Sequence, residues 1–263
     1  MKTLKLTLLA VLFTFTANIS AQTADEIIAN YFENTGGVDA WNSLKGLKMS
    51  GKVNVQGMEI PLEIVSLKDG RQYTKANFQG KELMQGVYDG ESMWSTNFMT
   101  QKAEKSEQEA TDNMKLQIND FPSPFLDYKA KGYTIELMGK EEVDGTEAFK
   151  IKLTTEPTMV DGKEEETVSY YFFDTENFVP IVVHTEIKTG QGKGMMSETK
   201  MSDYDEVEGL YFPFSMNQGV KGQPGGQPIA FDKIELNPTV DAKEFAFPEE
   251  AAVAPKTDDG NKN

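Results

Sequence analysis

Two runs rich in β-branched and aromatic residues, separated by a short polar turn, constrain the fold of this chain most strongly. The first run covers residues 166–173, the turn 174–177, and the second run 178–184. This pattern is typical of a β-hairpin. Pro180 lies near the start of the second run, where its missing N–H does least harm to a sheet. The segments before and after have the same character, so we predict a long antiparallel meander that forms one curved sheet.

The meander prediction rests on short strands at regular spacing. Gln-Gly, Asp-Gly and similar pairs between them supply the positive φ that tight turns need. Such spacing favours a sandwich or barrel over βαβ units. Residues 219–228, rich in Gly, Gln and Pro, are predicted as a loop. Besides the hairpin, the strands are predicted near residues 47–55, 58–67, 72–78, 82–88, 92–98, 133–142, 148–155, 195–207, 211–218 and 229–236.

Helices are predicted in two places. Thr23 and Glu26 form a capping box ahead of an apolar stripe that contains Ile27 and Tyr31, and Gly36-Gly37 ends this helix. A second short helix follows, with Val38, Trp41 and Leu44 at helical spacing. Residues 100–119 are predicted as an amphipathic helix, and residues 121–125 as a Pro-rich connector with two exposed aromatics, Phe121 and Phe125.

The N-terminus has the pattern of a secretory signal peptide, which we assign to residues 1–21. Lys2 and Lys5 form the charged region, and an apolar stretch too short to span a bilayer follows. The mature chain is predicted to begin at Gln22 and to be exported to the periplasm, without integral membrane segments. There is no cysteine, which excludes a disulfide framework and a thiolate metal site. Residues 249–263 lack apolar mass and are predicted to be a disordered acidic tail.

The chain is strongly acidic. Its net charge is −16, and removal of residues 1–21, which contain two lysines and no acidic residue, leaves −18. This charge argues against nucleic acid as a partner and against charge-driven binding to anionic membranes. Arg71 is the only arginine, so a clamp of paired arginines on phosphate or carboxylate is excluded.

No catalytic or metal-binding constellation emerges. His184 is the only histidine and lies in a predicted strand, so a structural role is expected for it. The acidic segment 203–209 fails the spacing of a calcium loop, because its glycine is one position late. We therefore predict no catalytic residue, no metal and no cofactor.

Methionine and aromatic residues are abundant and admit two interpretations. Met is a flexible gap-filler, common where a surface accepts varied apolar shapes. These residues either complete a core or line an apolar cavity for an acyl chain, which needs few polar anchors. The candidate lining residues are Met58, Met84, Met93, Trp94, Phe98 and Met114.

Several motifs, in this order along residues 24–237, resemble those of LolA-like outer-membrane lipoprotein-sorting proteins, in the form common in Bacteroidota. The segment from Ala24 to Tyr31, followed by Gly36-Gly37, is similar to the start of that family. The segment from Tyr88 to Trp94 is similar to its YDG…W strand pair. The later motifs are Tyr171-Phe-Phe-Asp174 with Val179-Pro180, and Ser202-Asp-Tyr204 with Glu208-Gly209-Leu-Tyr-Phe-Pro213.

The resemblance implies an incomplete β-barrel over residues 22–248, with helices across its concave side and an apolar interior that takes up acyl chains. The segments 24–32 and 100–119 would match the helical lids. The family uses an arginine on an early strand to control uptake and release. Its nearest counterpart here is Lys68, which lacks the planar fork of arginine, and Arg71 is a second candidate polar anchor.

These observations predict a periplasmic, non-enzymatic carrier or binder of lipid or lipoprotein acyl chains. A protein of the cell envelope is a further candidate partner of the carrier. One alternative is a structural or interaction protein with a filled core, which binds a partner through an exposed strand edge. A hydrolase with paired carboxylates is a further alternative, and it requires two carboxylates facing one cleft.

Overall fold

The computed structural model describes residues 22–248. The predicted signal peptide, residues 1–21, and the predicted tail, residues 249–263, lie outside the described residues. Between residues 22 and 248, no helix combines the length and the apolar character that a membrane crossing needs.

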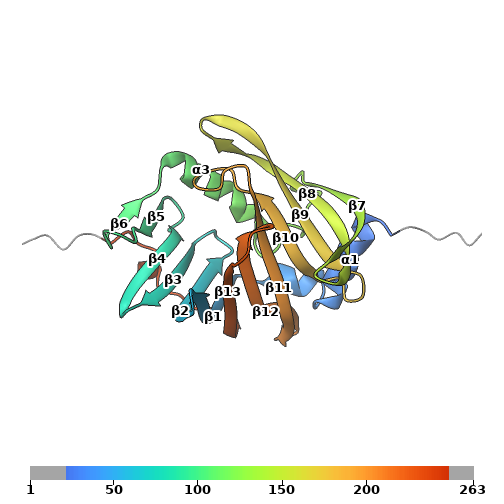
Figure 1. The fold of residues 1–263 in the computed structure, drawn as a ribbon, viewed down its shortest axis with the longest axis horizontal. Helices are drawn as coiled ribbons and strands as arrows, with labels where there is room; N and C mark the ends of the chain where they lie inside the picture. Colours follow the sequence, from blue (N-terminus) through green and yellow to red (C-terminus); the bar gives the residue numbers. More distant parts are fainter. Residues whose placement is uncertain (1–21, 249–263) are drawn as a thin grey trace, which may run out of the picture.

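Thirteen antiparallel strands form one sheet within residues 22–248 (Figure 1). They are β1 (Gly46–Val55), β2 (Met58–Leu67), β3 (Gln72–Phe78), β4 (Lys81–Tyr88), β5 (Met93–Thr96), β6 (Ala103–Lys105), β7 (Thr134–Val143), β8 (Thr146–Val160), β9 (Lys163–Asp174), β10 (Pro180–Glu186), β11 (Met196–Val207), β12 (Leu210–Val220) and β13 (Gln227–Leu236). Every neighbouring pair is consecutive in the chain except β1 and β13, and β6 and β7 are the two edges. The sheet is therefore an incomplete barrel, open between β6 and β7, which confirms the predicted fold class.

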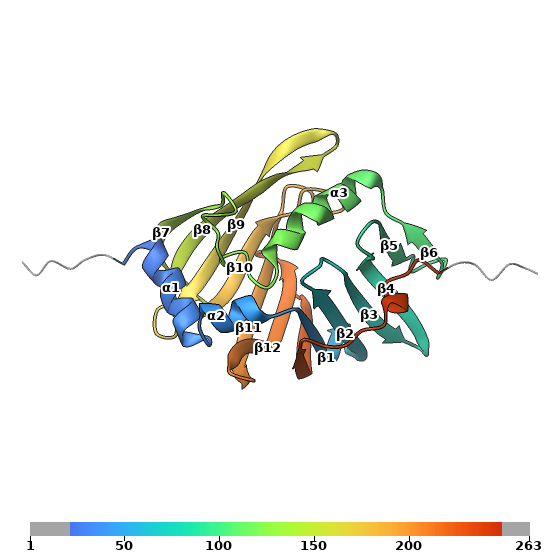
Figure 2. The same ribbon diagram turned by 180° about the vertical axis from the view of Figure 1, so that it is seen from behind.

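Helices lie over one face of this sheet, which we call the inner face (Figure 2). They are α1 (Ala24–Asn34), α2 (Val38–Ser43), α3 (Gln108–Gln117) and the 3₁₀ turn η1 (Ile118–Asp120). A second 3₁₀ turn, η2 (Ala242–Glu244), lies on the opposite face. The capping box of α1 is confirmed: Glu26 N–H donates to the Thr23 hydroxyl at 3.2 Å, and Thr23 N–H donates to the Glu26 carboxylate at 2.8 Å.

The predicted helix over residues 100–119 is wrong over residues 100–107. Residues 103–105 form the edge strand β6, and the helix begins only at Gln108. The Asn97 carboxamide oxygen accepts from Met99 and Thr100 N–H, and Gln101 has φ of 58°. These local bonds fold a tight turn that returns the chain onto β5, so pairing overrides helix propensity.

Three other predictions need correction. Phe125 is buried rather than exposed, because its ring packs on Tyr171 and Phe173 at centroid distances of 4.8 and 5.5 Å. The predicted loop 219–228 is shorter, since β12 continues to Val220 and β13 begins at Gln227. The strand predicted at 148–155 continues to Val160, where it forms a long hairpin with β9.

The main core lies between the inner face and helices α1 and α2. Phe173 on β9 is fully buried, and its ring contacts Tyr31 of α1 at 5.6 Å and Phe125 at 5.5 Å between centroids. Trp41 of α2 packs on Phe212 of β12 at 5.2 Å. These aromatic contacts hold α1 and α2 against strands β9 and β12 of the sheet.

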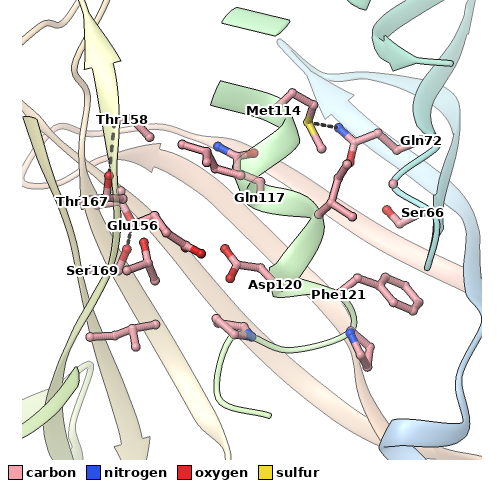
Figure 3. Close-up of a pocket in the computed structure, with 18 of the residues that line it drawn as sticks. Ser66, Gln72, Met114, Gln117, Asp120, Phe121, Glu156, Thr158, Thr167 and Ser169 are labelled. Atoms are coloured by element: carbon pink, nitrogen blue, oxygen red, sulfur yellow. Dashed lines mark hydrogen bonds between the residues drawn. The ribbon is translucent and has the colours of Figure 1, made fainter. Parts of the chain in front are cut away.

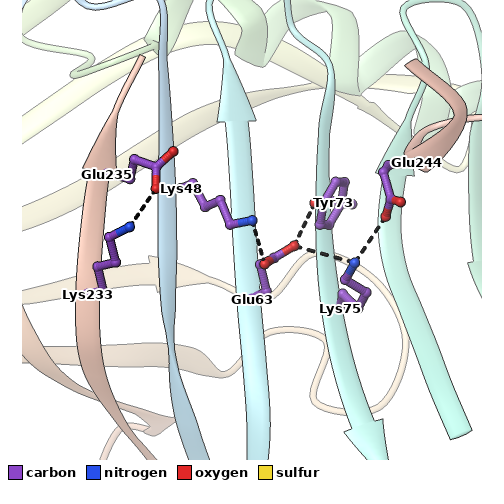
Figure 4. Close-up of polar contacts among 7 residues, drawn as sticks. All are labelled: Lys48, Glu63, Tyr73, Lys75, Lys233, Glu235 and Glu244. Carbon is purple, nitrogen blue, oxygen red and sulfur yellow. Dashed lines mark hydrogen bonds and ion pairs between the residues drawn. The ribbon is translucent and has the colours of Figure 1, made fainter. Parts of the chain in front are cut away.

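The opposite face of β1–β3 is covered by the segment after β13. A polar chain crosses the strands there: Lys48 pairs with Glu63 at 2.8 Å, and Lys75 bridges Glu63 and Glu244 at 3.4 and 3.0 Å (Figure 4). Trp94 Nε1 donates to the Phe245 carbonyl at 2.9 Å. The C-terminal segment therefore closes this face while the inner face stays free for the helices.

Replacing Phe173 by Ala tests the role of the aromatic core. We expect a loss of about 3–5 kcal/mol in the free energy of unfolding, because a fully buried ring leaves a cavity. Urea denaturation followed by tryptophan fluorescence measures it. Phe98→Ala is the control: Phe98 is 66% exposed, and a change within about 0.5 kcal/mol is expected. Equal losses in the two variants would contradict this assignment of the core.

Candidate functional site

A cavity of about 420 Å³ lies beneath α3, between the two halves of the open sheet (Figure 3). Ligand pockets commonly measure about 300–1,000 Å³, so the volume suits a small ligand or one chain of a larger one. It is lined by Leu47, Ser66, Leu67, Gly70, Gln72, Met114, Leu116, Gln117, Ile118, Asp120, Phe121, Pro122, Pro124, Leu153, Thr155, Glu156, Thr158, Thr167, Ser169, Tyr171 and Thr185.

The position of the cavity follows from the topology. Strands β6 and β7 are consecutive in the chain but lie at opposite edges of the sheet. Residues 106–133, which include α3 and η1, therefore cross the opening of the barrel. The cavity is the space left between this crossing segment and the inner face.

One wall and the roof of the cavity are largely apolar. Leu47 and Leu67 come from β1 and β2, and Met114, Ile118 and Phe121 come from α3, η1 and the connector. Met114 is buried, and the Gln72 carboxamide donates to its sulfur at 3.4 Å. This part of the cavity provides contacts for hydrocarbon.

The second wall, on β8–β10, carries hydroxyl groups at alternate positions. Thr167 and Ser169 point inward together with Tyr171, because successive side chains of a strand face opposite sides. Ser169 and Thr185 hydroxyls lie 3.0 Å apart, and those of Thr158 and Thr167 lie 3.2 Å apart. The cavity is thus amphipathic, with hydrocarbon on one side and hydroxyls on the other.

Two carboxyl groups, Asp120 and Glu156, lie between these walls (Figure 3). Burial raises the pKa of Asp120, and the neighbouring Glu156 charge acts in the same direction, while Tyr133 and Lys131 oppose the shift. Asp120 Oδ1 is buried, and no donor among the described residues is in good hydrogen-bond geometry with it, although the Tyr133 hydroxyl is close enough to favour its charged form. The carboxyl group is therefore held in an environment that disfavours its charge.

A glycine lets the crossing segment close tightly on the sheet. Gly70, in the β2–β3 turn, has φ of 92°, and a Cβ at this position would lie 2.5 Å from Ile118 Cγ1. Any other residue would be strained in that conformation and would push η1 away. Ile118 thus rests directly on the β2–β3 turn. We call the part of the crossing segment from Ile118 to Phe125 its inner end.

The N-terminal part of α3, which we call its outer end, is tied to the β8–β9 hairpin by polar contacts. We call these contacts the hairpin latch. Asn113 exchanges two hydrogen bonds with the Met159 backbone, at 2.7 and 2.9 Å. The Glu109 carboxylate accepts from the N–H groups of Asp161 and Gly162 at 3.1 and 2.8 Å. All four bonds are exposed to solvent.

Other hollows lie away from α3. One of about 680 Å³ is lined by residues that include Asn34, Asp174 and Tyr211, and one of about 450 Å³ by residues that include Lys152 and Glu186. No residue of α3 lines either of them. The cavity beneath α3 is singled out by its place in the barrel opening rather than by its volume.

The structure does not bring the six predicted lining residues together. Met114 lines the cavity. Met84 and Trp94 belong to the cluster under the C-terminal segment, on the opposite face, and Met93 begins β5. Met58 and Phe98 are exposed at turns.

The two predicted polar anchors lie in the β2–β3 turn, near the cavity but not among the residues that line it. Lys68 Nζ donates to the Asn42 carbonyl at 3.3 Å. Arg71 pairs with Asp69 at 2.8 Å and lies 5.1 Å from the Phe245 ring centroid. Both cations are engaged in contacts within the protein.

The hydroxyl wall and the two carboxyl groups were missed by the sequence analysis. Their signal is present: in β9, Thr167, Ser169 and Tyr171 alternate where a filled core would have large apolar side chains. Asp120 and Glu156 carry no comparable signal, because they are two among 42 acidic residues.

His184 is buried on the opposite side of the sheet from Thr185, and its Nε2 lies 2.9 Å from the Glu198 carboxylate. Its ring also packs edge-on against Phe172 at 4.9 Å. Within the described part of the chain, no group of three or more His, Asp or Glu residues could hold a metal ion.

Comparison with solved structures gives the fold. A Vibrio parahaemolyticus domain assigned as an outer membrane lipoprotein-sorting protein matches with a TM-score of 0.50 and 10% identity, over 84% of this chain and 94% of that domain. A LolA superfamily protein from Nitrosomonas europaea matches with a TM-score of 0.49 and 12% identity, over 86% of this chain and 98% of that protein. No family model and no curated protein matches the sequence. The likeness to the Vibrio domain shows that the chain has the fold expected from the sequence motifs.

The Asp120→Asn substitution tests the electrostatics of the cavity. The pKa of Asp120 is raised in the folded state, so the folded protein binds more protons than the unfolded chain between the two pKa values. Stability therefore falls as pH rises through this window, and the ionised carboxylate continues to cost stability above it. We expect Asp120→Asn to raise Tm relative to the wild type at pH 7, with the gain vanishing below about pH 4.

Thermal unfolding between pH 3.5 and 8 measures this difference. Asp232→Asn, at an exposed position on β13, is the control for loss of one negative charge. A difference in Tm that is independent of pH, or a loss of stability that grows with pH, would contradict the burial of Asp120.

Proposed function

We propose that the protein is a carrier or binder of lipid or lipoprotein acyl chains in the periplasm, with no catalytic step. The single observation that carries this proposal is the cavity in the barrel opening, roofed by the chain's own crossing segment. The predicted export of the chain and its lipoprotein-sorting fold support it. We also propose that residues 22–248 act as one domain and that an envelope protein receives the cargo.

Burial of hydrocarbon supplies the binding energy in this proposal. Each CH₂ that moves from water to the apolar wall contributes about 0.8 kcal/mol. Leu47, Met114 and Phe121 offer such a wall without a charged group of their own. A long acyl chain would therefore bind tightly without a dedicated polar anchor.

Uptake and release would require α3 to move. Besides the buried side chain of Thr111, the contacts that hold its outer end are the four solvent-exposed hydrogen bonds of the hairpin latch. Exposed hydrogen bonds exchange readily with water, and each contributes only about 0.5–1.5 kcal/mol. The inner end, where Phe125 packs on Phe173, would act as the fixed end.

The filled-core alternative finds less support. It requires that side chains fill the concave side, whereas the hydroxyl wall on β8–β10 leaves space opposite α3. In the cavity beneath α3, the paired-carboxylate alternative has one candidate pair, Asp120 and Glu156. His184 faces away from that pair, on the other side of the sheet.

Filling the cavity should abolish binding. We expect Ser169→Trp to weaken the binding of a fluorescent, uncharged C16 monoacylglycerol at least tenfold, because the indole would occupy the hydrocarbon's space. Val168→Trp is the matched control, since the neighbouring side chain points to the opposite face. Fluorescence titration measures both affinities, and native mass spectrometry of the wild type, purified after export, should show a bound lipid. If native mass spectrometry shows only the ligand-free protein and the C16 probe does not bind, the proposed function is wrong.

Weakening the hairpin latch should accelerate exchange. We expect Glu109→Ala combined with Asn113→Ala to raise the dissociation rate of the same probe at least fivefold in stopped-flow displacement, with a smaller change in affinity. Asp112→Ala is the control, because its side chain bonds only to Gln108 and Lys115 of the same helix. An unchanged rate in the double variant would show that α3 does not gate the cavity.

A further inference from the structure

The charge inside the cavity has one sign. Among the described residues that line it, Asp120 and Glu156 are the only ones with ionisable carboxyl groups, and none is a lysine, arginine or histidine. The remaining polar lining consists of hydroxyl and carboxamide groups. A negatively charged ligand group would therefore meet carboxylates and no counter-charge on the wall.

Lys188 lies beside the hydroxyl wall, and its ammonium group is occupied by protein acceptors. Lys188 Nζ lies 2.7–3.4 Å from four oxygens: the hydroxyls of Thr158 and Thr167 and the carbonyls of Glu165 and Glu166. An ammonium group has three donors, so none remains for a ligand.

Lys131, whose charge acts on Asp120, is held by contacts within the protein. Its Nζ donates to the Ser123 carbonyl at 3.4 Å and lies 5.6 Å from the Tyr133 ring centroid. Burial lowers its pKa, while the nearby charges of Asp120, Asp127 and Glu156 oppose that shift. Neither lysine is among the residues that line the cavity.

The same region holds hydrogen-bonding capacity that the protein does not use. Asp120 Oδ1 and the Tyr133 hydroxyl are buried near each other, and neither has a partner in good hydrogen-bond geometry within residues 22–248. Tyr133 is only 4% exposed, and its neighbours include Asp120 and Glu156. Buried polar groups without partners are costly, so a ligand that donates hydrogen bonds here would relieve a cost that the empty cavity bears.

We propose that the polar end of the bound lipid is uncharged and rich in hydroxyl groups, and that Asp120 and Glu156 select against lipids with an anionic phosphate. This inference rests on the proposed function and specifies its ligand. Hydroxyls of the ligand donate to the two carboxyl groups and exchange hydrogen bonds with Thr155, Ser169 and Thr185. Bonds to a carboxylate are about twice as strong as neutral ones, whereas a phosphate would face like charge in a partly desolvated site.

A matched pair of lipids tests the selectivity. The neutral probe is 1-palmitoylglycerol, and the anionic probe is 1-palmitoylglycerol 3-phosphate, which differs only by the phosphate. Isothermal titration calorimetry at concentrations below lipid aggregation gives both affinities. We expect the neutral probe to bind at least tenfold more tightly, which corresponds to about 1.4 kcal/mol. A third probe, hexadecyl glucoside, distinguishes a sugar from a glycerol as the source of the hydroxyls, and tight binding of either neutral probe supports the proposal.

Two double variants assign the selectivity to the carboxyl groups. Asp120→Asn with Glu156→Gln should narrow the ratio between the probes to about threefold or less, which is about 0.7 kcal/mol. Glu136→Gln with Glu142→Gln, at exposed positions on the edge strand β7, removes the same net charge outside the cavity and should leave the ratio unchanged. Circular dichroism confirms that both variants fold.

The outcomes separate this inference from the proposed function. Equal or tighter binding of the phosphate-bearing probe by the wild type would overturn the inference and leave the acyl-chain carrier standing. A ratio that persists in the Asp120/Glu156 double variant would overturn the assignment to these two residues. Binding of no probe at all would overturn both proposals.

Discussion

The pairing of the first strand with the last governs this structure. Because β1 pairs with β13, the two strands left unpaired at the edges, β6 and β7, are consecutive in the chain. The segment between them must then cross the barrel opening, whatever its own helical preference. The roof of the cavity is thus a consequence of the topology, and the cavity lies where the sheet fails to close.

The crossing segment is held differently at its two ends. At the inner end, Phe125 packs among aromatic rings and Ile118 rests on Gly70. At the outer end, Asn113 and Glu109 make only exposed hydrogen bonds to the hairpin. Burial of a ring contributes several kcal/mol, whereas an exposed hydrogen bond contributes about one. The difference supports a roof that is hinged at one end and released at the other.

The cavity is not purely apolar, and its polar groups indicate what kind of ligand it can hold. An apolar core would be more stable with Leu or Val in place of the Thr and Ser residues of β8–β10. Hydroxyls and two carboxyl groups instead face the apolar roof. Such a two-sided lining fits a ligand that is itself two-sided, with a hydrocarbon chain and a polar end.

The sequence alone determined the strands, the capped N-terminal helix and the family of folds, because alternation, turn glycines and capping pairs are local signals. It misplaced the start of α3, since residues 103–105 become a strand only through pairing with β5. It identified Met114 as a cavity residue but placed Trp94 there too, although Trp94 faces the C-terminal segment. Composition shows that a residue is apolar, but the face it occupies depends on strand register. The carboxyl pair formed by Asp120 and Glu156 depends on contacts between segments distant in sequence, so only the tertiary structure decided it.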